Sequence, residues 1–324
     1  MKKILVTGGC GFLGAAFIQK KFDESRDVDL VNYDSLTYAS IPERLSNLAT
    51  EPYYTFVKGD VADDDALSTL FDRAGPFDVV VHFAAETHVD RSLTNAIPFI
   101  RSNVLGTQIV LDQFRKQQHG KLIHISTDEI YGPAASGIYY KEDATPHPRN
   151  PYSATKAAAD HLVEAAVRSY GIDACIVRSV NVFGPSQYPE KFIPLAVTSL
   201  LHGGQIPLYG DGEQVRDWVY VDDYVRAVDL VVSSGHSGEV YHIAHQDERT
   251  NRQVAEAICA LCDVPVAQGI TRVDDRPGHD RRYGLDSSKL RAMGWTREID
   301  FSRGLRETVD YFRKHPGKPA PARS

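Results

Sequence analysis

Three glycines near the start of the chain constrain its fold more than any other feature. A short apolar run, residues 4–6, leads directly into Gly8, Gly11 and Gly14, and a helical pattern follows over residues 15–20. Glycines at this spacing let the backbone approach a pyrophosphate, whose charge is favoured at a helix N-terminus. A tight turn is the alternative for a glycine trio taken alone.

The second predicted strand, residues 28–33, ends at Asp34. A carboxylate about 20 residues beyond the last glycine can bind both ribose hydroxyls of a dinucleotide. The same carboxylate would repel a 2′-phosphate. The order strand, glycines, helix, strand and acid therefore predicts binding of NAD in preference to NADP.

The alternation of strand and helix continues along the chain. Strands are predicted at 54–59, 77–83, 121–125 and 175–178, with helices at 63–73 and 98–118 between them. Such alternation is typical of an α/β protein with a doubly wound parallel sheet, the Rossmann fold. After residue 178 the pattern is less regular, which predicts a smaller, mixed α/β C-terminal domain.

Composition excludes several classes of protein. The chain has 324 residues, 42% of them apolar and 24% charged, and a net charge of −7, which does not favour a general polyanion binder. No apolar run approaches the roughly 18–20 residues of a membrane span, and the short N-terminal run is not a signal peptide. We expect a cytoplasmic protein. Cys259 and Cys262 lie in a helical pattern without a second Cys or His pair, so no metal site is predicted.

Two hydroxyls and two carboxylates follow the predicted strand 121–125. They belong to Ser126, Thr127, Asp128 and Glu129. In open α/β sheets, ligands bind at the carboxyl ends of the strands. This stretch is therefore a candidate catalytic site, although a polar loop with a helix cap would look the same.

A tyrosine and a lysine are spaced four residues apart in the next predicted helix. Tyr152 and Lys156 therefore lie on one helical face. An ammonium beside a phenol favours the phenolate, so we expect the pKa of Tyr152 to be lowered and the side chain to act as a base. Alone, this spacing occurs often on protein surfaces.

Together these motifs resemble the extended short-chain dehydrogenase/reductases that act on nucleotide sugars. Within that group the resemblance narrows to the dTDP-glucose 4,6-dehydratase family. It is carried by residues 88–92 (HVDRS), 126–132 (STDEIYG), 189–194 (PEKFIP), 216–221 (RDWVYV) and 276–283 (RPGHDRRY). These motifs occur in the order of the family and, with the glycines, extend from residue 4 to about residue 314.

The resemblance implies oxidation at sugar carbon 4, elimination of water across carbons 5 and 6, and return of the hydride to carbon 6. Tyr152, with Lys156 and Thr127, would act at carbon 4. Glu129 would be the base at carbon 5, and Asp128 the acid at the carbon-6 hydroxyl. Neighbouring carboxylates in different protonation states suit such an elimination.

The resemblance also implies a domain division and two sets of binding residues. Residues 1–178 would form the NAD-binding domain, to which the chain returns at about 217–243; residues 179–314 would mainly bind the nucleotide sugar, and 315–324 would be a disordered tail. The expected NAD contacts are Gly8, Gly11, Phe12, Leu13, Gly14, Asp34, Thr37, Asp60, Val61, Phe83, Ala84, Ala85, Asn103, Ser126, Tyr152 and Lys156. The expected substrate contacts are His88, Asn181, Glu190, Lys191, Tyr209, Arg216, Asn251, Arg276 and His279.

Some alternatives stay open. A 4-epimerase of this fold would have no use for Asp128 and Glu129, and a non-catalytic NAD-binding regulator would not need Tyr152 and Lys156. The chain has Val182 and Phe183 where the family usually has asparagine and tyrosine, so UDP-glucose or UDP-N-acetylglucosamine could replace dTDP-glucose. By resemblance we also expect a homodimer formed through helices at about 98–118 and 151–170, and no nucleic-acid or membrane partner.

Overall fold

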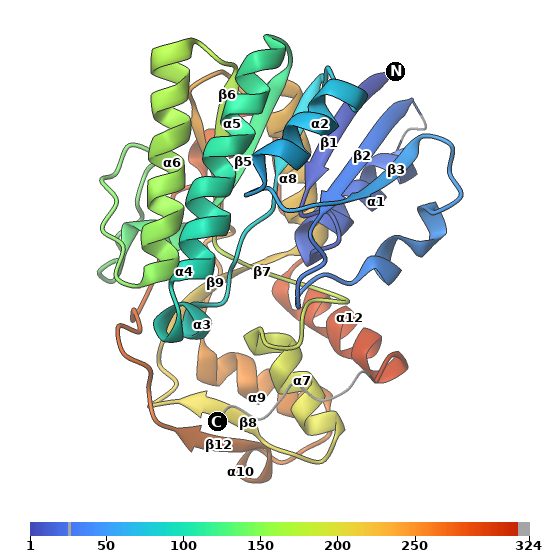
Figure 1. Cartoon of the computed structure of the whole chain (residues 1–324). Coiled ribbons are helices and arrows are strands. Elements are labelled where there is room, and N and C mark those ends of the chain that lie inside the picture. Colours follow the sequence, from blue (N-terminus) through green and yellow to red (C-terminus); the bar gives the residue numbers. More distant parts are fainter. Residues whose placement is uncertain (25–26, 317–324) are drawn as a thin grey trace.

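A computed structural model describes residues 1–24 and 27–316 of the chain, and its centre is a parallel sheet of seven strands (Figure 1). The strand order is β10-β6-β5-β4-β1-β2-β3. Neighbouring strands pair in parallel throughout. The strands are β1 (Lys2–Thr7), β2 (Val28–Asp34), β3 (Tyr54–Lys58), β4 (Val79–His82), β5 (Lys121–Thr127), β6 (Ala174–Ser179) and β10 (Val240–Ile243). The predicted doubly wound sheet is confirmed.

Helices cover both faces of this sheet because the strands are apolar on both sides. In β1, Leu5 faces one side, whereas Ile4 and Val6 face the other. Figure 1 shows α5 and α6 on one face and α1 and α8 on the other. The flanking helices are α1 (Phe12–Glu24), α2 (Asp64–Ala74), α5 (Gly106–Gln117), α6 (Pro151–Tyr170) and α8 (Val221–Ser234).

The strand order reverses between β1 and β4, and this reversal positions the site. Chain connections diverge there to opposite faces of the sheet, which opens a crevice at the carboxyl ends of the strands. The glycine loop follows β1, Phe83 follows β4, and Asp128 follows β5. Three sequence-distant segments therefore meet at one edge.

A second lobe closes this edge of the sheet. Its strands form a three-stranded sheet of β11 (Glu248–Thr250), β9 (Val215–Tyr220) and β7 (Asn181–Phe183), and a two-stranded sheet of β12 (Ile270–Val273) and β8 (Ile206–Tyr209). Its main helices are α7 (Phe192–Leu201), α9 (Asn251–Leu261) and α12 (Phe301–Lys314), with the short α10 (Val266–Gly269); the short α11 (Ser288–Ala292) packs against β10 of the central sheet. Between β9 and β11, α8 and β10 return to the central sheet.

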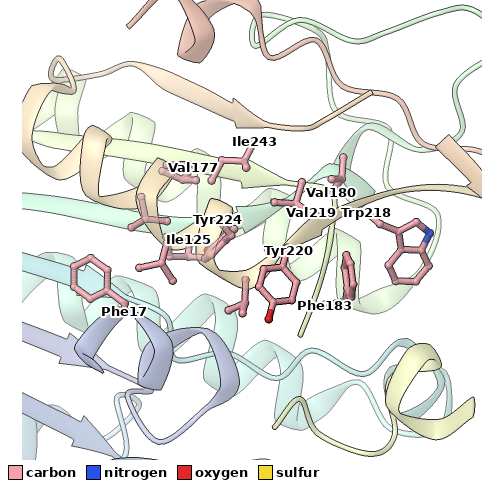
Figure 2. Close-up of a cluster of buried hydrophobic side chains, with 14 of the residues drawn as sticks. Phe17, Ile125, Val177, Val180, Phe183, Trp218, Val219, Tyr220, Tyr224 and Ile243 are labelled. Carbon is pink, nitrogen blue, oxygen red and sulfur yellow. The ribbon is translucent and has the colours of Figure 1, made fainter. Parts of the chain in front are cut away.

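The two lobes share one hydrophobic core. Figure 2 shows Ile125 and Val177 of the central sheet in the same cluster as Phe183, Trp218 and Tyr220 of β7 and β9. The Phe183 ring lies 6.1 Å from that of Trp218 and 5.6 Å from that of Tyr220, both nearly edge-on. Because apolar packing is continuous between the lobes, both sides of the cleft are supported by the same close-packed core.

Two details differ from the sequence-based prediction. Strand β5 extends through Thr127, two residues further than expected, and leads directly into the 3₁₀ turn η3 (Asp128–Tyr131). The helix predicted at 98–118 contains a π-helical segment, η2 (Ile100–Leu105), after α4 (Ile97–Phe99). Of the tail predicted to be disordered, residues 317–324 lie outside the described residues. Two further short helices, η1 (Pro42–Leu48) and α3 (Val89–Thr94), lie in loops of the first lobe.

Within the described residues, no helix combines the length and the apolar character that crossing a membrane requires. All four cysteines are free. Cys259 is buried in the packing of α9, and no group of three or more His, Cys, Asp or Glu side chains among the described residues could hold a metal ion.

Candidate active site

The crevice holds a cavity of about 310 Å³ between the two lobes. Its walls combine the glycine loop, the carboxyl ends of β4 and β5, the start of α6, and residues 179–193 of the second lobe. Backbone and side-chain groups from both halves of the chain thus line one cavity.

The glycine loop has no room for side chains. A Cβ on Gly8, where φ is +70°, would lie 2.6 Å from the backbone nitrogen of Ala84. A Cβ on Gly14 would lie 2.4 Å from the carbonyl oxygen of Gly8. The turn at the end of β1 therefore packs against the residue pair after β4, and the N-terminus of α1 faces a cavity in which a diphosphate would be well placed.

Asp34 lies in the same cavity at the end of β2, and its carboxylate is firmly held. It accepts hydrogen bonds from the backbone nitrogens of Cys10 (2.9 Å) and Leu36 (2.8 Å) and from the hydroxyl of Ser40 (2.7 Å). Two carboxylate oxygens offer about four acceptor positions, so capacity remains for a ribose hydroxyl. Position and chemistry both fit an adenosine ribose without a 2′-phosphate.

Nearly all of the predicted NAD contacts line the cavity. The exception is Asn103 in η2, which lies behind the cavity wall. Its side chain accepts a hydrogen bond from the backbone nitrogen of Glu86 (2.8 Å) and donates to the Glu86 carbonyl (3.0 Å) and to Thr155 (3.0 Å). Asn103 therefore shapes the loop after β4 and has no direct contact with the space itself. The residues that line the cavity as expected are Gly8, Gly11, Phe12, Leu13, Gly14, Asp34, Thr37, Asp60, Val61, Phe83, Ala84, Ala85, Ser126, Tyr152 and Lys156.

All five predicted catalytic residues lie together at the inner end of the cavity. The Thr127 hydroxyl donates to Asp128 Oδ1 (3.1 Å) and accepts from the backbone nitrogen of Glu129 (3.3 Å). The 3₁₀ turn thereby points the two carboxylates in different directions. Glu129 Oε2 meets Asn150 Nδ2 at 3.3 Å and the Tyr283 hydroxyl at 3.5 Å.

Asp128 is almost fully buried, and this decides its protonation. Burial and the neighbouring Glu129 charge raise the pKa of Asp128 to about 8, although Arg216 and the Thr127 hydrogen bond oppose the shift. Within the described residues, no hydrogen-bond partner is found for Asp128 Oδ2. A carboxylic acid that stays protonated near neutrality, with one oxygen unpartnered in a cavity wall, suits a proton donor.

Tyr152 and Lys156 behave differently from the sequence-based expectation. The pKa of Tyr152 is raised, because the side chain is buried and Glu129 lies nearby. Lys156 Nζ donates to the Ile125 carbonyl (2.7 Å) and lies 3.4 Å from His124 Nε2, so the ammonium is turned toward the sheet. The predicted lowering of the Tyr152 pKa by Lys156 is therefore wrong for this state. A cationic ligand group in the cavity would lower the pKa of Tyr152 again and favour its phenolate form.

Only four of the nine predicted substrate residues line the cavity, namely His88, Asn181, Glu190 and Lys191. Lys191 Nζ donates to the Thr87 carbonyl at 2.9 Å and joins the lobes across the cleft. Burial lowers the pKa of Lys191, and the Arg276 guanidinium lowers it further, which places Arg276 close to the cavity.

The other predicted substrate residues are engaged with protein groups. Arg276 pairs with Asp90 at 2.9 Å, and the Tyr209 hydroxyl donates to the same carboxylate at 3.0 Å. The Arg216 guanidinium lies 4.4 Å from the Tyr283 ring centroid and donates to the Asp280 carbonyl at 3.0 Å.

His279 and Asn251, the remaining two of the nine, also have protein contacts. His279 Nδ1 lies 2.6 Å from Asp275 Oδ1. Asn251 begins α9, and its backbone nitrogen donates to the carbonyl oxygen of Gln214 at 2.9 Å. Neither residue lines the cavity.

Two residues at the site were missed by sequence reasoning. Asn150 is the N-cap of α6 and also contacts Glu129, and Tyr283 approaches Glu129 from more than 150 residues away. Asn150 precedes Pro151, a common start signal for a helix, which could have identified it as a cap. No local pattern could have placed Tyr283 beside Glu129.

The family model that matches this chain and two of its relatives are described as 4,6-dehydratases. The family model described as GDP-mannose 4,6 dehydratase matches residues 5–308. The dTDP-glucose 4,6-dehydratase of Streptomyces niveus is 42% identical over 316 residues, which cover 96% of this chain and 93% of the relative. The dTDP-glucose 4,6-dehydratase 1 of Escherichia coli is 41% identical, with 96% and 92% covered.

Solved structures with the same fold include both dehydratases and epimerases. The dTDP-glucose 4,6-dehydratase of Streptomyces venezuelae, solved with NAD bound, superimposes with a TM-score of 0.92 at 41% identity, covering 96% of this chain and 97% of that one. The UDP-glucose 4-epimerase of Thermus thermophilus, also solved with NAD, gives 0.89 at 30% identity, covering 96% and 99%. The fold alone therefore does not separate the two activities, and the site residues must do so.

Proposed function

Because this chain belongs to the dTDP-glucose 4,6-dehydratase family, we propose that it converts dTDP-glucose to dTDP-4-keto-6-deoxyglucose. The reaction oxidises sugar carbon 4, eliminates water across carbons 5 and 6, and reduces carbon 6. NAD is the cofactor; when bound, it accepts the hydride from carbon 4 and supplies it to carbon 6, so none is consumed.

The observation that carries this proposal is the pair Asp128 and Glu129. An elimination needs a proton acceptor at carbon 5 and a proton donor at the departing carbon-6 hydroxyl. Asp128, with its raised pKa and its unpartnered Oδ2, is suited to donate. Glu129, held by Asn150 at 3.3 Å, is suited to accept. Each positioned group of this kind contributes roughly 10²–10⁴-fold to the rate.

Tyr152 is proposed to take the proton of the carbon-4 hydroxyl, with Thr127 holding that hydroxyl. The raised pKa of Tyr152 means that the phenol is protonated before ligands bind. A positive charge on the bound cofactor, close to a buried phenol, would favour the phenolate. Lys156 lies one helical turn away, where its ammonium donates to the Ile125 carbonyl, and its charge is proposed to add to that of the cofactor.

We propose that the substrate's diphosphate lies toward the second lobe, near Lys191 and Arg276. Both side chains are basic; Lys191 lines the cavity, and Arg276 is close enough to lower the pKa of Lys191. Arg276 is now paired with Asp90, so a diphosphate would have to compete with this carboxylate for the guanidinium. A planar guanidinium matches two phosphate oxygens, which favours that exchange. Asn181, Glu190 and His88 would contact the sugar nucleotide from the same wall.

The alternatives are less well supported. A 4-epimerase shares the fold but performs no elimination, so the buried acid at Asp128 would have no use in it. A non-catalytic regulator would not need five catalytic side chains around one cavity. A UDP-sugar 4,6-dehydratase is the second candidate, because none of the residues described above is assigned to recognition of the nucleotide base.

The test is direct. The purified chain would be incubated separately with dTDP-glucose, UDP-glucose and UDP-N-acetylglucosamine, and the 4-keto-6-deoxy product would be measured by its absorbance in base. We expect product from dTDP-glucose at the highest kcat/KM. A preference for a UDP-sugar would favour a UDP-sugar 4,6-dehydratase. The absence of product from all three substrates would refute a 4,6-dehydratase.

We also propose that the active form is a homodimer formed through α5 and α6 together with the α3–η2 segment. Exposed apolar side chains gather on these elements and support a second copy as the partner. They are Leu93, Ile97, Ile100, Leu105 and Tyr170. The four free cysteines are compatible with the proposed cytoplasmic location, where thiols stay reduced.

A further inference from the structure

A buried polar cluster lies behind the cavity, beneath α6. Tyr152, Lys156 and Asp160 follow one another at intervals of four residues and so share one face of that helix. Lys156 is 3% exposed and Asp160 is 0% exposed. The proposed mechanism uses the first two side chains and leaves the carboxylate of Asp160 without a role.

The imidazole of His124 in β5 lies between Lys156 and Asp160. His124 Nε2 lies 3.4 Å from Lys156 Nζ and 3.4 Å from Asp160 Oδ1. The ring is fully buried, and no hydrogen-bond partner is found for its Nδ1 among the described residues. One ring nitrogen therefore stands between an ammonium and a carboxylate.

The other side of Asp160 faces Arg178 of β6. Arg178 Nε donates to Asp160 Oδ2 at 2.8 Å, and Arg178 NH2 lies 3.6 Å from Glu164 Oε1. Further titratable groups around the cluster include the Tyr131 hydroxyl, which accepts from Arg178 NH1 at 2.5 Å and lies 2.8 Å from His242 Nε2, and His82, whose ring lies 5.5 Å from that of His124. Asp160 thus pairs directly with Arg178, and Lys156 is a second cation close enough to act on its carboxylate electrostatically.

Charge in this cluster depends on Asp160. Burial lowers the pKa of Lys156 to about 8, and the Asp160 carboxylate opposes that shift. Burial lowers the pKa of His124 to about 4, so the imidazole is neutral near pH 7. Burial alone would raise the pKa of Asp160, but His124, Arg178 and Lys156 together hold it at about 2. The anion beside Lys156 is therefore Asp160 at every working pH.

We propose that Asp160 is a positioning residue of this enzyme, whose buried carboxylate keeps Lys156 cationic one helical turn from Tyr152. Without it, no carboxylate would oppose the effect of burial on the pKa of Lys156, and the side chain would lose its proton at a lower pH. The inference rests on the role proposed above for Lys156. It extends the functional unit of α6 from two side chains to three.

A purely structural role is the competing explanation, in which Asp160 only neutralises the buried Arg178. Asp160→Asn alone would not separate the two, because it leaves an unpaired buried guanidinium that destabilises the fold. The informative comparison is between Arg178→Met and the double variant Asp160→Asn/Arg178→Met. Both lack the guanidinium, and only the double variant lacks the carboxylate, which in Arg178→Met still has Lys156 as a nearby cation.

The first readout is the ionisation of Lys156 itself. Protein labelled with ¹³C at the lysine ε carbon would be titrated by NMR, with the Lys156 signal identified by its absence from Lys156→Arg. We expect the pKa of Lys156 to be lower in the double variant than in Arg178→Met by at least about one unit, as expected for loss of a close opposite charge. Equal pKa values in the two variants would overturn the proposal.

The second readout is the rate of the first hydride transfer, followed by NADH absorbance in a Glu129→Gln background. Elimination is blocked there, so the ionisation of Asp128 as an acid does not enter. The fall in rate at alkaline pH should shift downward by about one pH unit in the double variant. An unchanged pH profile would overturn the proposal. If no nucleotide sugar yields NADH at all, the proposed function fails, and the NMR titration still decides the charge of Lys156.

Discussion

At the scale of single residues, Asp128 and Glu129 are neighbours in the chain with different surroundings. Asp128 is enclosed by the sheet and the Thr127 hydroxyl, whereas Glu129 faces Asn150 and Tyr283. The two residues are adjacent at the start of the 3₁₀ turn after β5, yet their side chains have different neighbours. These different surroundings support the proposed roles of Asp128 as acid and Glu129 as base.

Replacing the proposed base should divide the reaction in two. In Glu129→Gln, the groups that act at carbon 4 are intact, so the first hydride transfer should proceed and NADH should accumulate. Turnover should fall by at least about 10²-fold, because proton removal at carbon 5 loses its base. Stopped-flow absorbance and a product assay would measure the two effects. Normal product formation would contradict the role given to Glu129.

The raised pKa of Asp128 predicts the pH dependence of elimination. The protonated form donates, and it is lost as the pH rises through about 8, so kcat should fall above that pH. Asp128→Asn cannot donate a proton, so its residual rate should be at least about 10²-fold lower and should lack this fall. The check is kcat against pH for both proteins; a wild-type kcat that stays constant to pH 10 would contradict the assignment.

At the scale of elements, the N-terminus of α6 connects helix stability to catalysis. Asn150 caps the helix by accepting from the Ser153 backbone nitrogen at 2.8 Å, and its amide group holds Glu129. Pro151 at the first helical position and the αL Gly171 at the end set the length of the helix. Tyr152 and Lys156 therefore enter the cavity from a helix whose start is fixed by a residue of the site.

A matched pair of cap substitutions tests this double role. Asn150→Ala and Thr250→Ala each remove the N-cap of a capping box, on α6 and on α9 respectively. Each should cost about 1 kcal/mol of unfolding free energy. Only Asn150→Ala should also lower kcat, by about tenfold or more, since a hydrogen bond to a charged group is lost. Denaturant unfolding and steady-state kinetics would measure both; equal kcat values in the two variants would show that Asn150 acts only as a cap.

At the scale of the whole molecule, the active site depends on both lobes. We propose that residues 1–178, with the returning segment 217–243, bind NAD, and that residues 179–314 mainly bind the nucleotide sugar. Strand β10 pairs with β6 in the central sheet, so α8 and β10 belong to the first lobe in space although they follow part of the second in sequence. Figure 1 shows α7, α9 and β8 gathered below the sheet as a separate lobe.

The proposed dimer makes a prediction for mass in solution. A second copy should cover the apolar side chains around η2, so Ile100→Asp should convert a dimer into a monomer of 35.9 kDa. Phe56→Asp is the control, because Phe56 is also exposed, at 40% against 48% for Ile100, but lies on the edge strand β3. Size-exclusion chromatography with light scattering would measure both. A wild-type monomer, or a dimer that survives Ile100→Asp, would exclude this interface.

The sequence by itself determined the features that depend on short stretches of chain. The glycine loop with Asp34, the alternation that builds the sheet, and the spacing of Tyr152 and Lys156 are local patterns, and local geometry follows from local residues. The resemblance to the dehydratase family likewise rests on contiguous motifs. These features sufficed for the fold, the family and the five residues at the inner end of the cavity.

Only the tertiary structure decided the features that depend on burial and on contacts between distant segments. The high pKa of Asp128 comes from enclosure by both lobes, and Tyr152 proved to be more basic than the lysine spacing suggested, because desolvation outweighs a charge that faces the sheet. Tyr283 reaches Glu129, and His124 lies between Lys156 and Asp160, through folding alone. The energy of a charge depends on its whole surroundings, which a linear pattern does not contain.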